Sequence, residues 1–532
     1  MQAGFHVEHF GCRAARADGE AVSDRLRAAG LSEQLPSAAD VVVVNTCSVT
    51  AEADRAARAF IRRAHRLNPE ARIVVTGCYA QRAPNELAGI PGVAAVVGNS
   101  HKALAPAIAL HLALTIAENC PSVSGHDFSR AADAPIRTRA LAPEDCSSEI
   151  PLESVPPTSA FKAAIDQPKV TNQPSHSATR TGLVSVQSLL AGGHVPGQAP
   201  IWADDRFAHS FLDEAQLVPG MQTRPNLKIQ EGCGNRCTFC VIPQTRGSSK
   251  SLPRAAVLKQ VEGFVAAGGN ELVLSGINLG RWGRDLAESQ IADGLTRPTL
   301  AGLVRQILEQ TALPRLRLSS IEPMDWNQEL IGLMAEFGGA RLARHAHLPL
   351  QSGSDAVLRR MHRRYRPWHY AEKVAALVHA AGPELTLGAD VMVGFPGETD
   401  SEFDETLELV RELPFGYLHL FPFSPRPATR AWALHAERPV PAAVVEERMS
   451  QLRALALKKS ETHRRRFIGR TLEAITLHTP AELAGFGFTA ALTANFLPVE
   501  LQSKLPANRL VRVRVTGLNA ETTLQAAALN PS

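Results

Sequence analysis

The sequence predicts an α/β protein with three folded parts: a parallel α/β domain, an open barrel of repeated βα units and a small C-terminal β domain. Strand and helix patterns alternate before residue 118 and again from about residue 224, and a β-branched alternation lies near the C-terminus. A chain of 532 residues is too long for one hydrophobic core, since domains usually have roughly 100–200 residues.

Residues 1–118 are predicted to form the parallel α/β domain. Residues 41–44 are all valine, as expected for a strand buried on both faces, and residues 73–75 repeat this pattern. Between them, residues 51–67 are rich in helix-forming residues, and the helical pattern ends before Asn68-Pro69. The order strand, helix, strand is typical of a βαβ unit.

Residues 119–223 have a different composition, with recurring prolines separated by serine, threonine and alanine. A segment of this kind buries too little apolar surface to offset the entropy lost on ordering. We therefore predict a largely disordered insertion, and we interpret Cys120 and Cys146 within it as free thiols without a role.

Residues 224–470 are predicted to form the open barrel, ending in a long basic helix from Ala442 to Arg470. Six candidate strands are visible, which favours a partial barrel over a closed eight-stranded one. The candidate strands are residues 227–229, 271–275, 315–319, 345–350, 388–393 and 417–421. Residues 471–532, with alternating β-branched residues at 510–515, are predicted to form the small β domain.

Composition favours neither a membrane class nor a disordered class for the whole chain, because 45% of the residues are hydrophobic and 20% are charged. A net charge of +4 permits a nucleic-acid partner without requiring one. Residues 1–12 lack the apolar core of a signal peptide, and the apolar run 107–117 is shorter than the roughly 20 residues that span a bilayer. We therefore expect a cytoplasmic protein without a membrane partner.

Eight cysteines are too few for a disulfide scaffold in a chain of this length, so their positions become the main evidence. Cys233, Cys237 and Cys240 have the spacing C-x-x-x-C-x-x-C directly after a predicted strand. Three thiolates on a four-iron four-sulfur cluster leave one iron open, where S-adenosylmethionine can bind and be cleaved to a radical. A zinc loop with a distant fourth ligand and unrelated thiols are the alternatives.

Cys12, Cys47 and Cys78 are far apart in sequence, but each follows a predicted strand. Parallel strands end at the same edge of a sheet, so these three thiols are expected to meet there and to hold a second four-iron four-sulfur cluster. The alternative is that they are small buried residues at strand ends.

A further set of residues is assigned to binding of S-adenosylmethionine because it lies in the cysteine motif or at predicted loop and strand-end positions. Glycines after the first barrel helix allow close approach of a ligand, although a helix C-cap explains them equally well. The others follow predicted strand ends, where a βα barrel has its active site, although each could instead make a local hydrogen bond. The set is Phe239, Gly268, Gly269, Glu271, Ser320, Glu322, Gln351 and Asp390.

Two basic stretches suit RNA phosphates, although charged runs are usually solvated helix faces. The first is residues 359–366, five arginines with Tyr365 among them. The second comprises Lys458, Lys459, Arg464, Arg465, Arg466 and Arg470 on the late helix.

Several segments resemble signatures of the radical-S-adenosylmethionine (radical-SAM) methylthiotransferase family, and the similarity spans most of the chain except the insertion. These segments are residues 45–50, 76–81, 228–233, 240–243, 348–354 and 393–398. Val49-Thr50, Arg246-Gly247 and residues 319–323 are most similar to the branch that acts on threonylcarbamoyladenosine beside the tRNA anticodon. Ala15 stands where the family usually has asparagine, and the insertion is longer than the family's connection.

The resemblance implies an N-terminal auxiliary-cluster domain, a radical-SAM partial barrel and a C-terminal TRAM domain, an OB-like β module that binds RNA. It implies two four-iron four-sulfur clusters, S-adenosylmethionine as cofactor, and the anticodon arm of tRNA as partner. An electron donor such as flavodoxin or ferredoxin is expected, whereas the sulfur donor is unknown.

The function implied is conversion of C2–H of N6-threonylcarbamoyladenosine to C2–S–CH3. Isopentenyladenosine in tRNA and an aspartate of a ribosomal protein are alternative substrates. A non-enzymatic RNA-binding protein with structural zinc is the alternative from another class.

Overall fold

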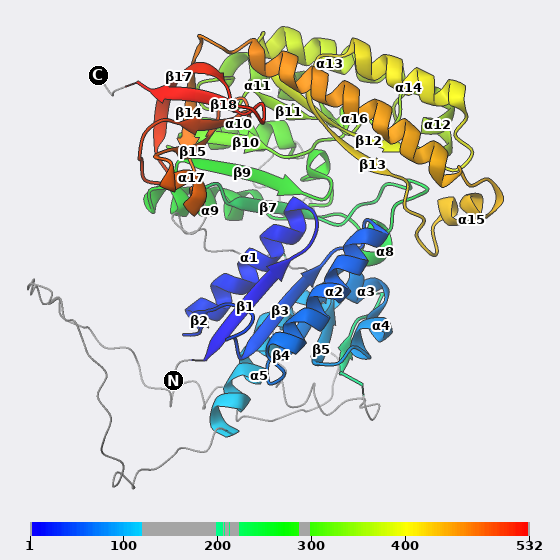
Figure 1. The fold of residues 1–532 in the computed structure, drawn as a ribbon, viewed down its shortest axis with the longest axis vertical. Coiled ribbons are helices and arrows are strands. Elements are labelled where there is room, and N and C mark those ends of the chain that lie inside the picture. The colour runs from blue at the N-terminus through cyan, green and yellow to red at the C-terminus, as the bar shows by residue number, and fades with distance from the viewer. Residues whose placement is uncertain are drawn as a thin grey trace, which may run out of the picture.

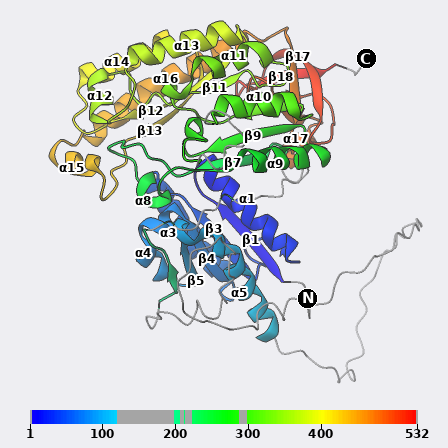
Figure 2. The same cartoon turned by 180° about the vertical axis from the view of Figure 1, so that it is seen from behind.

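The computed structural model describes residues 3–119, 198–205, 207, 212, 223–286 and 298–529. The N-terminal domain lies below the open barrel in Figure 1, and the C-terminal strands flank the barrel; Figure 2 shows the same arrangement from behind. Cys120, Cys146 and most of the predicted insertion lie outside the described residues. The boundaries at residues 118, 223 and 470 stay predictions.

The N-terminal domain is built on a six-stranded parallel sheet in the order β2-β1-β3-β4-β5-β6. Its strands are β1 (Gly4–His9), β2 (Ser32–Glu33), β3 (Val41–Thr46), β4 (Arg72–Gly77), β5 (Val93–Gly98) and β6 (Ile201–Trp202). The predicted parallel α/β fold is confirmed, with the valines of β3 fully buried.

Helices cover both faces of this sheet. On one face α1 (Arg13–Ala28) and α5 (Ala105–Asn119) pack on Val41 and Val43. On the other face α2 (Ala51–Leu67), α3 (Cys78–Arg82) and α4 (Pro84–Ala88) pack on Val42 and Val44. This two-sided covering explains the continuous apolar run, because every side chain of β3 points into a core.

Strand β6 lies inside the range that we predicted to be a disordered insertion. Ile201 and Trp202 pair with Val96 and Val97 of β5, and Trp202 is 8% exposed. The prediction was wrong for residues 198–205, because a two-residue strand between prolines and polar residues is too short to show a periodicity of its own.

The open barrel consists of six parallel strands arranged as two sheets, with one short antiparallel strand added. The first sheet has the order β10-β9-β7-β8 and the second the order β11-β12-β13. Backbone hydrogen bonds of Leu316 with Arg341 and Ala343 join the two sheets. The strands are β7 (Asn226–Glu231), β8 (Lys250–Ser251), β9 (Glu271–Gly276), β10 (Arg315–Leu318), β11 (His345–His347), β12 (Thr386–Val393) and β13 (Phe415–Pro422). The six predicted strands and the partial barrel are confirmed.

Helices cover the outer face of the barrel, and polar side chains occupy the inner face. Leu316 and Leu318 of β10 belong to the core beneath the helices, whereas Arg315 and Arg317 alternate with them. The helices are α8 (Ile242–Arg246), α9 (Arg254–Ala266), α10 (Leu300–Gln310), α11 (Gln328–Phe337), α12 (Asp355–Arg360), α13 (Pro367–Ala381), α14 (Asp400–Glu412), α15 (Arg430–Glu437) and α16 (Ala442–Arg465).

The C-terminal strands form a closed five-stranded barrel in the order β14-β15-β16-β18-β17, as the predicted small β domain requires. They are β14 (Thr471–Thr476), β15 (Thr489–Thr493), β16 (Pro498–Leu501), β17 (Leu510–Leu518) and β18 (Leu524–Ala528), and α17 (Ala481–Gly485) connects β14 to β15. Val513 and Val515 of β17 point into its core, which confirms the alternation read at residues 510–515.

Among the helices of the described residues, none combines the length and the apolar character needed to cross a membrane.

Candidate active site

Cys233, Cys237 and Cys240, here called the loop triplet, lie in the turn that follows β7. The Cys233 amide donates to Gly247 O at 3.1 Å, and the Cys240 amide donates to Cys237 O at 3.2 Å. Gly232 precedes the triplet with φ +67°, and a Cβ there would lie 1.9 Å from Ser248 O. Only glycine allows the chain to turn so tightly at this position, and the turn brings the three thiols around one centre.

Amide and guanidinium donors surround the sulfur atoms of the loop triplet. Asn278 Nδ2 donates to Cys233 Sγ at 3.4 Å, and Arg363 Nη1 donates to Cys237 Sγ at 3.4 Å. The amide of Ile242 donates to Cys240 Sγ at 3.5 Å. Such donors stabilise thiolates and set the potential of an iron-sulfur cluster bound to them.

Cys12, Cys47 and Cys78, here called the sheet-edge triplet, follow β1, β3 and β4. Cys47 and Cys78 are each 3% exposed, whereas Cys12 is exposed at the N-terminus of α1. A Cβ on Gly11 would lie 2.6 Å from Cys47 Sγ, and Gly11 has φ +108°. The carboxyl ends of neighbouring parallel strands thus bring these thiols together, and Gly11 leaves room for the approach.

The sheet-edge triplet has a matching set of donors. Arg246 Nε donates to Cys78 Sγ at 3.2 Å, and Asn99 Nδ2 donates to the same sulfur at 3.4 Å. The Val49 amide donates to Cys47 Sγ at 3.5 Å.

Burial raises the pKa of the Cys47 thiol to about 12, and the neighbouring Cys78 and Cys12 add to this shift. Burial likewise raises the pKa of Cys240 to about 12. Thiols with such pKa values are neutral at neutral pH unless a cation deprotonates them. A bound metal cluster supplies that positive charge, so both triplets fit the chemistry of a metal–thiolate site.

The sulfur atoms of each triplet are not all within 4.8 Å of one another. In the described part of the chain, only His347, Asp390 and His419 have ligand atoms that all lie within 4.8 Å of one another. Neither cysteine triplet is that compact. Thiolates on one zinc ion converge on a centre at about 2.3 Å, whereas a four-iron four-sulfur cube holds them farther apart.

A buried ionic network links the two triplets. Asp18 of α1 contacts Lys102 Nζ at 2.6 Å, Arg246 Nη2 at 3.1 Å and Lys228 of β7. Arg246 and Lys228 also pair with Glu231, the residue that ends β7. Removing one partner from such a buried set costs roughly 3–5 kcal/mol, so the network fixes the N-terminal domain against the open barrel.

Opposing charges control ionisation within this network. Burial opposes the charge of Asp18, but Lys102, Lys228 and Arg246 hold its pKa well below the usual range. Burial also opposes the charge of Arg246, yet Cys78, Asp18 and Glu231 raise its pKa well above the usual value. Both side chains are therefore charged at neutral pH.

A cavity of about 340 Å³ lies beside the loop triplet. Cys237, Glu322 and Arg363 line it, and Arg363 Nη2 pairs with the two carboxylate oxygens of Glu322 at 2.7 and 2.8 Å. The structure therefore brings Glu322 to the cysteine loop. A small cofactor with amino, carboxylate and ribose groups would meet both signs of charge here.

Three of the residues assigned to S-adenosylmethionine lie elsewhere. Gly268, with φ +83°, ends α9, and Gly269 and Glu271 lead into β9 at its amino end. The cysteine loop follows the carboxyl end of β7, which runs parallel to β9. Their assignment to the pocket beside the cysteines was wrong, because the glycines close a helix and Glu271 is buried among arginines.

The carboxyl end of β9 instead supplies Asn278, which the sequence reasoning missed. Its amide donates to Gln230 Oε1 at 2.6 Å, and its side chain donates to Cys233. The signal was the Gly276-Ile277-Asn278 turn directly after the strand pattern.

The remaining assigned residues follow strands on the expected face. Phe239 lies within the cysteine loop with its ring 6.5 Å from that of Phe395, and Ser320 follows β10. Gln351 follows β11 with φ +65°, and its buried Oε1 has no hydrogen-bond partner. A non-glycine residue in the left-handed region with an unused acceptor is typical of a binding position.

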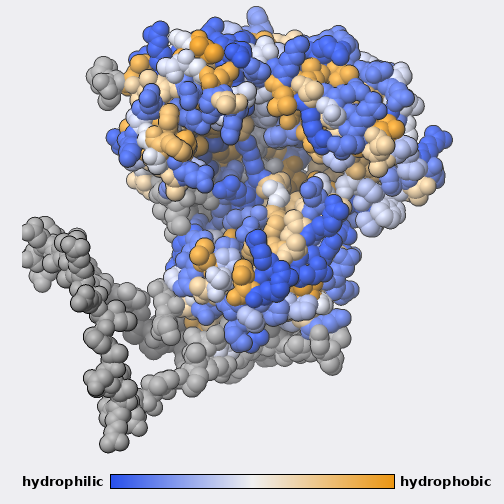
Figure 3. Space-filling model, viewed as in Figure 1, coloured by the Kyte–Doolittle hydropathy of each residue, from blue (hydrophilic) through white to orange (hydrophobic). Residues whose placement is uncertain are grey.

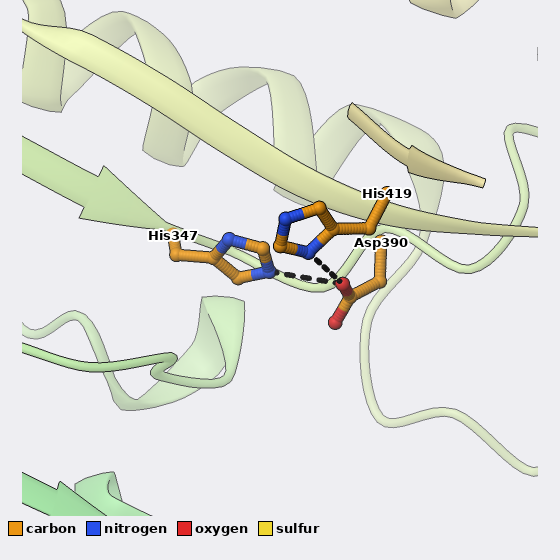
Figure 4. A group of neighbouring side chains, drawn as sticks. All are labelled: His347, Asp390 and His419. Atoms are coloured by element: carbon orange, nitrogen blue, oxygen red, sulfur yellow. Dashed lines mark hydrogen bonds and ion pairs between the residues drawn. The ribbon is translucent and has the colours of Figure 1, made fainter. Parts of the chain in front are cut away.

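Asp390 of β12 lies between two histidines, as Figure 4 shows. His347 Nε2 and His419 Nδ1 approach the same carboxylate oxygen at 3.1 and 3.2 Å. Burial raises the pKa of Asp390, but hydrogen bonds from the two histidines outweigh it and hold the pKa below the usual range. Asp390 is therefore an anion on the inner face of the barrel.

The arginine run at residues 359–366 is mostly engaged within the protein. Arg359 and Arg366 pair with Asp355, Arg360 pairs with Glu402, and Arg363 is buried at the loop triplet. Its expected role in binding RNA phosphates was wrong for Arg363, because that guanidinium contacts Cys237 and Glu322.

Comparison with known proteins agrees with this arrangement. Residues 4–98 match the family described as Uncharacterized protein family UPF0004, and residues 227–410 match the Radical SAM superfamily. The two matches contain the sheet-edge triplet and the loop triplet, respectively.

Relatives among curated proteins cover up to 96% of this chain. The threonylcarbamoyladenosine tRNA methylthiotransferase MtaB of Bacillus subtilis is 31% identical over 96% of this chain and 93% of its own length. The tRNA-2-methylthio-N(6)-dimethylallyladenosine synthase of Erythrobacter litoralis is 37% identical over 48% of this chain and 54% of its own. Among solved structures, the radical S-adenosylmethionine methyltransferase TsrM of Kitasatospora setae is 16% identical, covering 82% of this chain and 76% of its own, with a TM-score of 0.46.

The similarity to the Bacillus subtilis enzyme spans nearly the full length of both chains. This chain therefore belongs to the radical-SAM methylthiotransferase family, in the branch that contains MtaB.

Proposed function

We propose that this enzyme methylthiolates N6-threonylcarbamoyladenosine beside the anticodon of tRNA, converting C2–H to C2–S–CH3. The observation that carries the proposal is the near full-length similarity to threonylcarbamoyladenosine tRNA methylthiotransferases. The dimethylallyladenosine synthase matches only about half of this chain, which favours the threonylcarbamoyl substrate.

The loop triplet would hold one four-iron four-sulfur cluster, and the sheet-edge triplet would hold the other. When bound, the first cluster would supply the electron that cleaves one S-adenosylmethionine, and the resulting 5'-deoxyadenosyl radical would take the hydrogen from C2. The second cluster would supply the sulfur, and a second S-adenosylmethionine would supply the methyl group. A radical is required because C2–H of adenine is too inert for acid–base chemistry. With three cysteines as ligands, each cluster would have one iron without a protein ligand, where a non-protein group could bind.

The protein residues around the loop triplet would bind and orient S-adenosylmethionine and shield it from water. Glu322 and Arg363 line the cavity beside Cys237, where they would contact the polar groups of S-adenosylmethionine. Phe239 would pack against its apolar parts, and Ser320, Gln351 and Asp390 lie on the same side of the barrel.

The anticodon arm of tRNA is the macromolecular partner, and the closed C-terminal barrel contributes to its binding as an OB-like module. Reduction of the first cluster requires a low-potential donor such as flavodoxin or ferredoxin, and the reaction takes place in the cytoplasm.

Mass spectrometry of tRNA nucleosides from a deletion strain tests the proposal. We expect 2-methylthio-N6-threonylcarbamoyladenosine to disappear and its unthiolated precursor to accumulate. The wild-type gene should restore the product, whereas Cys237→Ala should not. Loss of 2-methylthio-dimethylallyladenosine instead, or of a modified ribosomal aspartate, would contradict the proposed substrate.

A further inference from the structure

Four arginines from three segments gather on the inner face of the open barrel, away from the loop triplet. Arg13 begins α1 directly after Cys12, Arg224 precedes β7, and Arg315 and Arg317 lie on β10. We call Arg13, Arg224, Arg315 and Arg317 the arginine cluster. It begins beside a cysteine of the sheet-edge triplet.

The arginine cluster has fewer carboxylates than guanidiniums. Glu271 accepts hydrogen bonds from Arg317 Nε at 2.7 Å, Arg224 Nε at 2.8 Å and Arg315 Nη1 at 3.2 Å. Arg315 also pairs with Glu473 at 2.7 Å. Arg13 has no carboxylate partner among the residues that the structure describes. Two carboxylates thus face four guanidiniums, and the excess charge is positive.

Phe496, from the loop between β15 and β16 of the closed barrel, fixes the position of three of these arginines. The guanidinium carbons of Arg317, Arg13 and Arg224 lie 5.3, 5.5 and 5.8 Å from its ring centroid. Phe496 has φ +68°, a conformation that costs about 1–3 kcal/mol and persists only where the surrounding structure enforces it. The N-terminal domain, the open barrel and the closed barrel therefore meet at this ring.

One guanidinium donor of the cluster is buried without a partner. Arg317 is 0% exposed, and its Nη1 makes no hydrogen bond, although its other nitrogens bond to Glu271 and Thr493 O. Buried donors in proteins are almost always paired, and an excess of buried positive charge is costly without a counter-charge. Arg13 is only partly buried, so a ligand carboxylate that reaches Arg13 would offset the excess positive charge of the cluster.

We propose that the arginine cluster, with Arg13 as the principal contact, binds the free carboxylate of the threonylcarbamoyl group. This inference rests on the proposed function. The threonine in this substrate is joined through its nitrogen, so its carboxylate stays ionised, whereas a dimethylallyl group at the same position carries no charge. The planar guanidinium matches a carboxylate in two-point contact, which gives orientation as well as affinity.

The position of Arg13 gives this contact a second consequence. Because Arg13 follows Cys12 directly, a carboxylate bound by Arg13 is held next to the segment that carries this cysteine. Arg13 is thus a specificity residue that selects the substituent of the target adenosine.

Equilibrium binding to reconstituted protein tests the inference with three anticodon stem-loops that differ only at the target adenosine. The first carries threonylcarbamoyladenosine, the second its methyl ester, and the third unmodified adenosine. The wild-type protein should bind the acid roughly tenfold to a hundredfold more tightly than the ester, as expected for a charge-assisted contact.

Arg13→Gln should remove most of this preference, and Arg13→Lys should keep part of it. Arg305→Gln is the matched control, because Arg305 lies exposed on α10, where it pairs with Glu309 and Glu336, and it should keep the full preference. Iron content per chain should be equal in all four proteins, which shows that the clusters are intact.

Equal binding of acid and ester by the wild-type protein would overturn the inference, as would an undiminished preference in Arg13→Gln. A uniform loss of affinity of Arg13→Gln for all three RNAs would assign Arg13 to a phosphate and also overturn it. If the wild-type protein prefers the acid but does not methylthiolate it, the proposed function fails and the carboxylate site stands. If the wild-type protein methylthiolates the acid and the ester equally well, the proposed function stands and the carboxylate site fails.

Discussion

The two cysteine triplets reach similar surroundings by different routes. The loop triplet is formed within residues 233–240 by one turn, whereas the sheet-edge triplet is assembled from the ends of three strands. Both contain a buried arginine that donates to a cysteine sulfur and pairs with a glutamate. These pairs are Arg363 with Glu322 and Arg246 with Glu231. Each triplet also receives an asparagine side chain, from Asn278 and Asn99, respectively.

The difference lies in what each triplet depends on. The loop triplet needs one turn and the cavity beside it, whereas the sheet-edge triplet needs the whole parallel sheet and the Asp18 network that docks it on the open barrel. The face in Figure 3 is hollowed where the N-terminal domain meets the open barrel. The geometry between the two triplets is therefore a property of the interface between two domains, and the sheet-edge triplet should be the more sensitive to distant changes.

Removal of one cysteine from each triplet should give the largest and most distinct effects. Cys237→Ala should abolish both 5'-deoxyadenosine formation and the methylthiolated product, because S-adenosylmethionine is no longer cleaved. Cys47→Ala should abolish the product while 5'-deoxyadenosine still forms. Chromatography of a single reaction mixture measures 5'-deoxyadenosine and the methylthiolated product together. A Cys47→Ala protein that still makes the product would contradict the separate roles of the two triplets.

The two buried arginines should differ in their effect on stability. Arg246→Met leaves Asp18 and Glu231 short of a counter-charge at a fully buried site and should cost roughly 3–5 kcal/mol. Arg363→Met should cost less, because Glu322 is 22% exposed and water can solvate it. Urea unfolding of the two variants measures the difference, and equal losses would contradict the ranking.

Gly11→Ala and Gly268→Ala form a matched pair of changes at glycines with positive φ. A Cβ on Gly11 meets Cys47, so this variant should lose iron from the sheet-edge triplet in addition to about 1–2 kcal/mol of backbone strain. No atom lies within 4 Å of a Cβ on Gly268, so that variant should show strain alone and keep its iron. Iron analysis and thermal unfolding separate the two outcomes.

The pH dependence of the Asp18 contribution should be small near neutral pH. The folded-state pKa of Asp18 is depressed, so its stabilising contribution is complete above the unfolded pKa of about 3.9 and is lost as pH falls further. The stability difference between wild type and Asp18→Asn should therefore be constant from pH 7 to about pH 5 and shrink below about pH 4. Urea unfolding of iron-free protein measures the stability difference between wild type and Asp18→Asn. A difference that grows as the pH falls would contradict the predicted direction of the effect.

The fold and the positions of the two cysteine triplets could be predicted because their signals are local. Four consecutive valines mark a strand covered on both faces, and a cysteine after each such strand is a position that parallel topology brings to one edge. The short spacing of Cys233, Cys237 and Cys240 needs no tertiary information at all.

The surroundings of the cysteines could not be predicted because they depend on contacts between distant segments. Arg246 meets Cys78 across 168 residues, and Arg363 meets Cys237 across 126. In the sequence, Arg363 belongs to a basic run that suggests RNA binding, and only its tertiary partners show that it is a buried counter-charge. The assignment of Gly268, Gly269 and Glu271 to the cofactor pocket failed for the same reason. A glycine pair after a helix can either cap the helix or form a turn that contacts a ligand, and the sequence is the same in both cases.

Iron and acid-labile sulfide in anaerobically reconstituted protein test the central claim most directly. The wild-type protein should contain about eight of each per chain, and Cys47→Ala and Cys237→Ala should each contain about four. A wild-type content of about four, or stoichiometric zinc in place of iron, would contradict the assignment of a cluster to each triplet.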